Sequence, residues 1–195
     1  KIKNKFFILL CTRLSLYLYH NFTIINMRKK LIMALIALFS ISNLTYAEKG
    51  DKVNVGDNVP SFTITEDNGT KISSDKYKGK VTLITFFATW CPPCQKELAE
   101  YQKDLWPKYK DNKDFALVVI GREHSSADLQ KYNQKKGFTF PLYPDKNRMI
   151  YNSFAENLIP RCYLIDKSGK VVYAGKGFKE EDYKELMKAI DKALE

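Results

Sequence analysis

The feature that most restricts the fold is an uninterrupted run of β-branched, leucine and aromatic residues, Val81–Phe87. Such a run is typical of a central strand that is covered on both faces of a sheet. From Pro92 onward the apolar residues recur at helical spacing, and Pro107 is expected to end or kink the helix. The predicted helical stripe consists of Cys94, Leu98, Tyr101 and Leu105. The chain therefore contains a buried strand that leads directly into a helix.

Further strands and helices alternate on both sides of this unit. Before it, residues 59–65 alternate as a half-buried strand does, a turn follows at 66–69, and residues 70–73 form the hairpin partner. After it, the pattern predicts strands at 115–121, 161–166 and 171–174, helices at 125–137, 149–154 and 179–194, and a further segment at 138–143. This order predicts an α/β fold of three layers, α/β/α, with a mixed central sheet and an N-terminal β-hairpin extension.

Residues 27–47 have the three parts of a secretory signal. Met27 is followed by basic residues, by an apolar stretch at 31–41 that is short for a membrane span, and by small residues that end at Ala47. We therefore expect export with cleavage after Ala47; an uncleaved signal that anchors the chain in the membrane is the alternative. Residues 1–26 are expected to be translated sequence upstream of the true start, with a genuine first membrane segment as the alternative. The remaining residues, 48–195, are expected to form one domain.

The charge of that domain is modest. The first 47 residues hold seven of the 32 Lys and Arg and none of the 22 Asp and Glu, so the net charge falls from +10 to +3 when they are set aside. This balance gives no support to a nucleic-acid partner. Cys91, Cys94 and Cys162 remain in the domain. In an oxidising compartment such thiols pair, react or are buried.

The motif Cys91-Pro92-Pro93-Cys94 allows three interpretations. A structural zinc site normally needs four ligands, and the only further candidates are Cys162 and His124, far away in sequence. No metal site is therefore expected. A purely structural disulfide would close a very short loop, for which the entropic gain is small. The third interpretation is a catalytic dithiol.

The position of the motif favours catalysis. The predicted strand delivers Cys91 to the edge of the sheet, and Pro92 suits the first position of the following helix. Cys91 then precedes a helix N-terminus, where free amides and the helix dipole favour a thiolate. Cys94 lies one turn inside the helix and can attack a mixed disulfide at Cys91. Cys91 is thus the expected nucleophile and Cys94 the resolving thiol.

The order of strand, Trp90-Cys91-Pro92-Pro93-Cys94, helix, and then Ile159-Pro160 before a strand and hairpin resembles a thioredoxin-fold protein. Further motifs are similar to the exported TlpA/ResA-like branch, with its AhpC/TSA-type thioredoxin domain, over residues 53–194: Val59-Pro60-Ser61-Phe62, Gly79-Lys80, Glu97 and the segment 163–169. The resemblance implies that Pro160 is cis and faces the nucleophile. It also implies that the neighbouring backbone binds the substrate chain as an added strand.

The resemblance further assigns site residues. Trp90, Pro92, Pro93, Ile159 and Pro160 are the expected substrate-binding residues, and the redox-active Cys91–Cys94 disulfide replaces any cofactor. Glu97, one turn after Cys94, would move protons to and from the dithiol if burial raises its pKa; a surface glutamate beside Lys96 is the alternative. Glu97 would act alone, since Thr85 stands where thioredoxin has an acid.

Three other positions carry specific expectations. Ala99 stands where many relatives have a helix-kinking proline, so a straighter helix is expected. Cys162 is interpreted as a buried inert thiol, with a third redox centre as the alternative. His124 is interpreted as a solvated residue of a polar loop.

The expected function is that of an exported thiol-disulfide oxidoreductase of the periplasm or cell envelope. The two prolines between the cysteines supply no cation and no N–H donor, which favours a reductant or a mid-potential exchanger. Expected partners are disulfide-containing envelope proteins or apocytochrome c, with a membrane thiol reductase as electron donor. A peroxiredoxin is one alternative, although Ala88 replaces the threonine that this family needs. A non-catalytic binding module or copper chaperone is the other.

Overall fold

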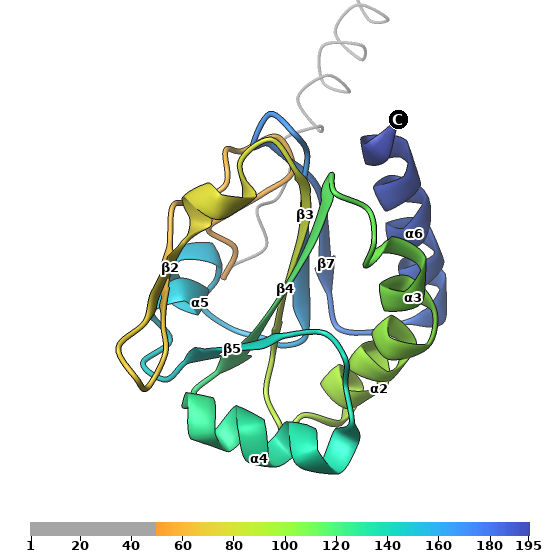
Figure 1. Ribbon diagram of the computed structural model, residues 1–195. Helices are drawn as coiled ribbons and strands as arrows, with labels where there is room; N and C mark the ends of the chain where they lie inside the picture. Colours follow the sequence, from red (N-terminus) through yellow and green to blue (C-terminus); the bar gives the residue numbers. More distant parts are fainter. Residues whose placement is uncertain (1–49) are drawn as a thin grey trace, which may run out of the picture. The chain divides into compact units, whose positions relative to one another are not determined.

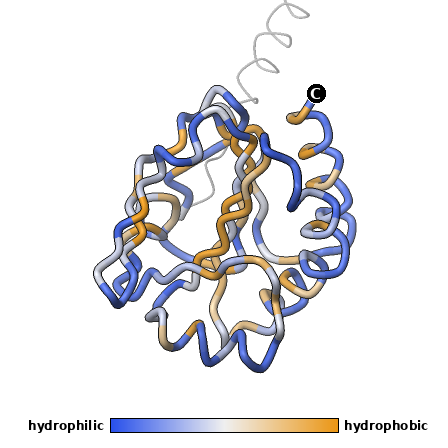
Figure 2. Tube along the Cα trace, in the orientation of Figure 1, coloured by the Kyte–Doolittle hydropathy of each residue, from blue (hydrophilic) through white to orange (hydrophobic). Residues whose placement is uncertain are grey.

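Strand β3 (Val81–Phe87) is buried at all seven of its residues and lies at the centre of the sheet. The computed structural model describes residues 50–195, so the predicted signal at 27–47 and the segment 1–26 lie outside the described residues. The central strands form the most hydrophobic part of the trace (Figure 2). This agrees with the prediction of a doubly covered strand.

The main sheet has five strands in the order β5-β4-β3-β6-β7 (Figure 1). Strand β3 pairs in parallel with β4 (Phe115–Arg122), which pairs in parallel with β5 (Leu142–Asp145). On its other side β3 pairs antiparallel with β6 (Arg161–Ile165), which forms a hairpin with β7 (Val171–Lys176). The predicted mixed sheet is confirmed.

Helices and a small hairpin cover the two faces of this sheet (Figure 1). One face packs on α2 (Pro92–Glu100) and α6 (Glu180–Leu194), with Leu98, Leu186 and Ile190 fully or almost fully buried. The other face packs on α5 (Met149–Phe154) and on the antiparallel pair β1 (Thr63–Thr65) and β2 (Lys71–Ser73), which leads into the short 3₁₀ helix η1 (Ser74–Tyr77). Helix α4 (Ser126–Lys136) contributes Leu129 to the core. The result is the predicted three-layer fold with a β-hairpin extension.

The helix after the dithiol departs from the prediction in two ways. It continues past Pro107 as α3 (Trp106–Tyr109), and a π-helical segment, η2 (Tyr101–Leu105), precedes the proline. The Trp106 N–H bonds to the Tyr101 carbonyl five residues earlier. Proline lacks an N–H and clashes with the carbonyl four residues before it, and the wider π turn accommodates it. The helix therefore does not end at Pro107, and the segment after Ala99 contains a π turn and does not continue as a regular α-helix.

The first predicted strand is also shorter than expected. Residues 59–65 alternate in sequence, yet only Thr63–Thr65 forms strand β1, because its partner strand β2 has just three residues. The backbone of Val59 instead donates to the Gly169 carbonyl in the β6–β7 turn. Among residues 50–195, no helix combines the length and the apolar character that crossing a membrane requires.

Candidate active site

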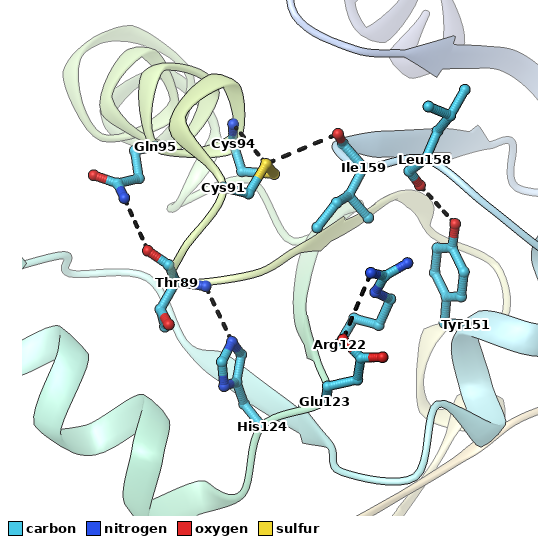
Figure 3. The surroundings of a disulfide bond; sticks show 10 residues. All are labelled: Thr89, Cys91, Cys94, Gln95, Arg122, Glu123, His124, Tyr151, Leu158 and Ile159. Atoms are coloured by element: carbon cyan, nitrogen blue, oxygen red, sulfur yellow. Dashed lines mark hydrogen bonds and ion pairs between the residues drawn. A yellow bond between two sulfur atoms is a disulfide. The ribbon is translucent and has the colours of Figure 1, made fainter.

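The site is built around the Cys91–Cys94 disulfide at the N-terminus of α2 (Figure 3). Cys91 is the N-cap residue, and the backbone N–H of Cys94 points at its sulfur at 3.3 Å. Pro92 begins the helix, as its fixed φ angle and missing N–H favour. Cys91 retains 4% of its exposure, whereas Cys94 has none. Cys91 is thus the more exposed of the two residues, and its sulfur receives a helix N-terminal amide.

The loop before β6 forms the other side of the site. The Ile159–Pro160 peptide bond is cis, as the family resemblance implies. The Ile159 carbonyl oxygen lies 3.8 Å from the sulfur of Cys91 (Figure 3). The preceding Leu158 is 60% exposed with a left-handed φ of 66°, and its carbonyl accepts a 2.6 Å hydrogen bond from the Tyr151 hydroxyl. Tyr151 therefore holds this loop beside the dithiol.

A buried ion cluster fixes the same loop from behind. Arg161 donates from Nε to the Asn157 carbonyl at 2.8 Å and forms an ion pair with Asp51, which also pairs with Lys176. Arg161 is only 2% exposed. These bonds join the N-terminal segment of the described chain, the loop before the cis proline and strand β7. This cluster was not predicted from the sequence, because its members lie far apart along the chain.

Trp90 presents the largest aromatic surface next to the cysteines. It is 58% exposed, and Pro92 and Pro93 are exposed as well. The guanidinium of Arg122 lies 5.7 Å from the Trp90 ring centre and 4.9 Å from that of Tyr151. Arg122 ends β4, whose carboxyl end lies at the same sheet edge as that of β3. Because parallel strands end at the same edge of a sheet, the predicted pairing of these two strands could have placed Arg122 near the dithiol.

Glu97 lies behind the dithiol and is 3% exposed, so it is not a surface glutamate. Burial raises the pKa of Glu97 to about 8, opposed in part by a hydrogen bond with Tyr101. Its Oε2 atom has no hydrogen-bond partner among the described residues. The Tyr101 hydroxyl in turn lies 3.0 Å from that of Thr85 on β3. Thr85 therefore belongs to the buried polar cluster of Glu97 and Tyr101.

Cys162 is a free, buried thiol, as expected. It pairs with Thr85 in the β3–β6 ladder, and burial followed by the charge of Glu97 raises the pKa of its thiol well above the ordinary value. A cavity of about 10 Å³ lies between Glu97 and Cys162, close to the space that one water needs. Its raised pKa and its burial behind the dithiol make Cys162 a poor nucleophile.

The structure contradicts the prediction that His124 is solvated. It is 8% exposed, and its Nε2 atom accepts a hydrogen bond from the Thr89 backbone N–H at 3.0 Å (Figure 3). The polar sequence around it suggested a loop, which is correct. However, Glu123 adopts a left-handed φ of 69° and the chain turns at this point after β4.

Comparison with known proteins places this arrangement in a family. Residues 54–190 match the Redoxin family. The thiol-disulfide oxidoreductase ResA of Bacillus cereus is 32% identical over 146 residues, which cover 74% of this chain and 83% of that protein. The ResA of Bacillus subtilis is 28% identical over 154 residues, 77% of this chain and 84% of its own.

Solved structures agree with this result. A structure from Bacteroides thetaiotaomicron, named as a protein disulfide isomerase, is similar with a TM-score of 0.70 and 35% identity over 75% of this chain and 93% of its own. A thiol:disulfide interchange protein DsbE structure from Chlorobium tepidum has a TM-score of 0.62 and 26% identity over 73% of this chain and 99% of its own. The chain therefore belongs to the Redoxin family, and it is a ResA-like thiol-disulfide oxidoreductase of the thioredoxin superfamily.

Proposed function

We propose that the protein is an exported reductant that opens disulfides of other envelope proteins, with Cys91 as nucleophile and Cys94 as resolving thiol. The observation that carries this assignment is the contrast between the two sulfurs. Cys91 keeps some exposure, receives the Cys94 N–H and faces the Ile159 carbonyl, whereas Cys94 is fully buried. An attacking thiol needs access and a stabilised thiolate, and a resolving thiol needs only proximity to its partner.

The reaction transfers two electrons to the client. The Cys91 thiolate attacks one sulfur of the client disulfide, a Cys91–client disulfide forms, and the other client sulfur leaves as a thiolate. Cys94 then loses its proton and attacks the Cys91 sulfur, which releases the second client thiolate and forms the Cys91–Cys94 disulfide. The two client sulfurs end as thiols, and the oxidised protein needs two electrons from another dithiol before the next cycle.

Glu97 is the proposed proton carrier for the second step. A carboxyl group with a pKa of about 8 can hold or release a proton near neutral pH, which is the requirement for general acid-base catalysis. Its carboxylate form would take the proton of Cys94, and its acid form would return it to a leaving sulfur. Its burial in the turn after Cys94 and its unpaired Oε2 atom support this role.

The client chain is proposed to dock between Trp90 and the loop that contains Leu158 and Ile159. Both Trp90 and Leu158 are more than half exposed, and a bound client chain would cover this apolar surface. Pro92 and Pro93 lie at the exposed start of α2, and the buried Pro160 holds the Ile159 carbonyl toward Cys91. Backbone pairing with an extended client depends little on its sequence, which suits a reductant of several proteins.

The place and partners of the reaction are also part of the proposal. The signal-like residues 27–47 support export, with cleavage or retention as a membrane anchor. The named relatives are thiol-disulfide oxidoreductases and a DsbE-type interchange protein, which supports protein thiols as substrates. Disulfide-containing envelope proteins or apocytochrome c are the proposed clients, and a membrane thiol reductase is the proposed electron donor.

A trapping experiment tests this assignment. Insulin, a generic disulfide protein, is mixed with the reduced protein and with the variants Cys94→Ser and Cys91→Ser. We expect Cys94→Ser to accumulate a mixed disulfide between Cys91 and insulin, and Cys91→Ser to accumulate none, because the second step alone is blocked in the first variant. Trapping through Cys94 in the Cys91→Ser variant would reverse the roles. No reduction of insulin by the unaltered protein would refute the proposed function.

A further inference from the structure

The four residues that lead from β3 into the dithiol form a tight turn. The Cys91 N–H donates to the Ala88 carbonyl at 3.1 Å, which closes the turn over Thr89 and Trp90. In such a turn the backbone groups of the first central residue point outward and need partners of their own. That residue is Thr89, directly before Trp90.

Two side chains from separate elements hold both backbone groups of Thr89 (Figure 3). The Thr89 N–H donates to His124 Nε2 at 3.0 Å, and the Thr89 carbonyl accepts from Gln95 Nε2 at 2.8 Å. Gln95 lies on α2, one residue after Cys94, and its Oε1 atom accepts from Lys136 at 3.0 Å. We call this arrangement of His124, Thr89 and Gln95 the Thr89 clamp.

The loop after β4 is shaped to deliver His124 to this position. Glu123 has a left-handed φ of 69°, which is uncommon for a residue with a side chain and costs free energy. Its N–H donates to the Asp145 carbonyl at 3.0 Å, and the His124 N–H donates to the Gly121 carbonyl at 3.3 Å. The imidazole packs near the Phe87 ring, with 6.4 Å between ring centres. The strained backbone, the burial and the hydrogen bond together specify one ring position.

The hydrogen bond requires a neutral imidazole. Because the Thr89 N–H can only donate, Nε2 must be the unprotonated nitrogen, and the ring proton resides on Nδ1. Protonation at Nε2 would place two donors against each other and break the clamp. The acidic groups that act on the ring are Asp128 of α4 and Glu123 beside it. Both would favour protonation, while burial has the larger and opposite effect and lowers the pKa of His124.

We propose that His124 is a positioning residue of the dithiol: its neutral ring, together with Gln95, holds the turn that presents Trp90 and Cys91 to the client. The inference rests on the proposed role of Cys91 as nucleophile. A fixed turn keeps the Cys91 sulfur between the Cys94 N–H and the Ile159 carbonyl, so less reorganisation is needed when the sulfur is attacked or attacks. Without the imidazole acceptor, the backbone N–H of Thr89 loses its hydrogen-bond partner, one residue before Trp90.

Thiol exchange with a small disulfide tests the proposal. The rate with dithiobis(nitrobenzoate) is measured for the reduced full-length protein and for His124→Leu, Gln95→Leu and His124→Gln. His124→Leu and Gln95→Leu are each expected to slow the reaction on the order of tenfold, the effect of one unpartnered polar group. His124→Gln offers an amide oxygen near the position of Nε2 and is expected to recover most of the rate at neutral pH.

The pH dependence separates positioning from a merely structural role. The glutamine in His124→Gln does not titrate, whereas Cys91 and Glu97 titrate in both proteins. Dividing the exchange rate of the unaltered protein by that of His124→Gln therefore removes the effect of Cys91 and Glu97 from the pH dependence. We expect that ratio to fall severalfold once the pH is low enough to protonate His124, which happens below the ordinary histidine range because burial lowers the pKa of this ring. A ratio that stays constant down to the lowest pH at which both proteins remain folded would overturn the proposal, and this ratio decides the question even if His124→Leu does not fold.

The matched control is Gln102→Leu. Gln102 also joins a helix to a loop backbone, because its Oε1 atom accepts a hydrogen bond from the Thr139 backbone N–H at 2.8 Å. Its side chain forms no hydrogen bond to the dithiol turn among the described residues. The exchange rate of Gln102→Leu should match that of the unaltered protein, however much stability the substitution costs. The ratio of its rate to that of His124→Gln should also change with pH as it does for the unaltered protein. An equal slowing in Gln102→Leu and His124→Leu would overturn positioning. Absence of exchange in the unaltered protein would instead refute the proposed function itself.

Discussion

The carbonyl oxygen of Ile159 faces the sulfur of Cys91 at 3.8 Å, although the two residues are 68 positions apart in the chain. The contact brings the loop before β6 to the N-terminus of α2. The buried pair Arg161 and Asp51 and the Tyr151–Leu158 hydrogen bond hold that loop from its other side. The active site is thus made by two segments whose relative position depends on residues outside the dithiol motif.

Client docking can be tested at Trp90. Trp90→Ala removes a large exposed apolar surface beside Cys91, and a protein client should therefore bind more weakly. We expect KM for insulin to rise about fivefold or more with a smaller change in kcat, because the loss affects binding rather than the exchange step. Steady-state insulin reduction measures both constants. The exposed Val55, which lies outside the described site, provides a control as Val55→Ala. Equal KM values for the two variants would contradict docking at Trp90.

The proton-transfer role of Glu97 predicts that resolution of the mixed disulfide slows when its carboxyl group is replaced. Glu97→Gln keeps the shape of the side chain and cannot carry a proton, so resolution by Cys94 should slow about a hundredfold or more. The mixed disulfide with insulin should then accumulate during turnover, as it does in the trapping variant. Rapid acid quenching followed by gel analysis would show it. Lys96→Met, on the exposed side of the same helix turn, serves as control. Unchanged resolution in Glu97→Gln would exclude the proton-carrier role.

Burial of Glu97 also predicts how stability depends on pH. The pKa of Glu97 is about 8 in the folded protein and near 4.5 when unfolded, so between these values the folded state holds the extra proton. Its contribution to stability is complete below about pH 4.5 and is lost as the pH rises through about 8. The unfolding free energy of the unaltered protein should therefore fall between pH 5 and pH 8, whereas that of Glu97→Gln should not fall for this reason. The difference, variant minus unaltered protein, should increase over this range by on the order of a few kcal/mol. Urea unfolding at both pH values measures it, and a constant difference would contradict the assigned pKa.

The ion pair of Arg161 and Asp51 is predicted to matter for stability. Arg161→Met removes one partner of a pair that is almost completely buried, and we expect a loss of about 3–5 kcal/mol in unfolding free energy. The exposed pair of Lys78 and Asp75, at 2.6 Å, is the matched comparison. Lys78→Met should leave stability nearly unchanged, because solvent screens this exposed pair. Similar losses in the two variants would show that the buried pair is not a special support of the loop.

Cys162 should be dispensable for exchange. Its burial and raised pKa predict that iodoacetamide labels Cys91 in the reduced protein and spares Cys162, which peptide mass spectrometry can resolve. Cys162→Ala is expected to keep insulin reduction and to lose about 1–2 kcal/mol of stability through the small cavity it leaves. A large loss of turnover in a folded Cys162→Ala protein would revive the alternative of a third redox centre.

The sequence predicted the part of the site that is local. Cys91, Cys94 and Glu97 follow one another across a strand end and one helical turn, so their relative positions depend on short-range geometry. The central strand and most helices were predicted for the same reason. Pro160 could be placed near them only through the family resemblance, because its loop meets Cys91 through a long-range contact, that of the Ile159 carbonyl.

The parts that could not be predicted depend on tertiary packing. His124 looked solvated because its neighbours are polar, and its burial follows from the left-handed turn at Glu123. The continued helix around Pro107 depends on a π turn that no simple periodicity indicates. The place of Arg122 near the dithiol depends on the order of the strands, and that of Asp51 beside Arg161 depends on the path of the N-terminal segment. Such residues appear in a sequence only as ordinary surface charges.

The most direct test of the central claim is the reduction potential of the Cys91–Cys94 couple. The protein is equilibrated in dithiothreitol or glutathione buffers, and the state of the dithiol is followed through Trp90 fluorescence and thiol alkylation. A potential near or below the roughly −270 mV of thioredoxin is the predicted result and identifies an electron donor that must be re-reduced by another dithiol. A potential near the roughly −120 mV of DsbA would identify a disulfide-forming oxidant and contradict the proposed direction of the reaction.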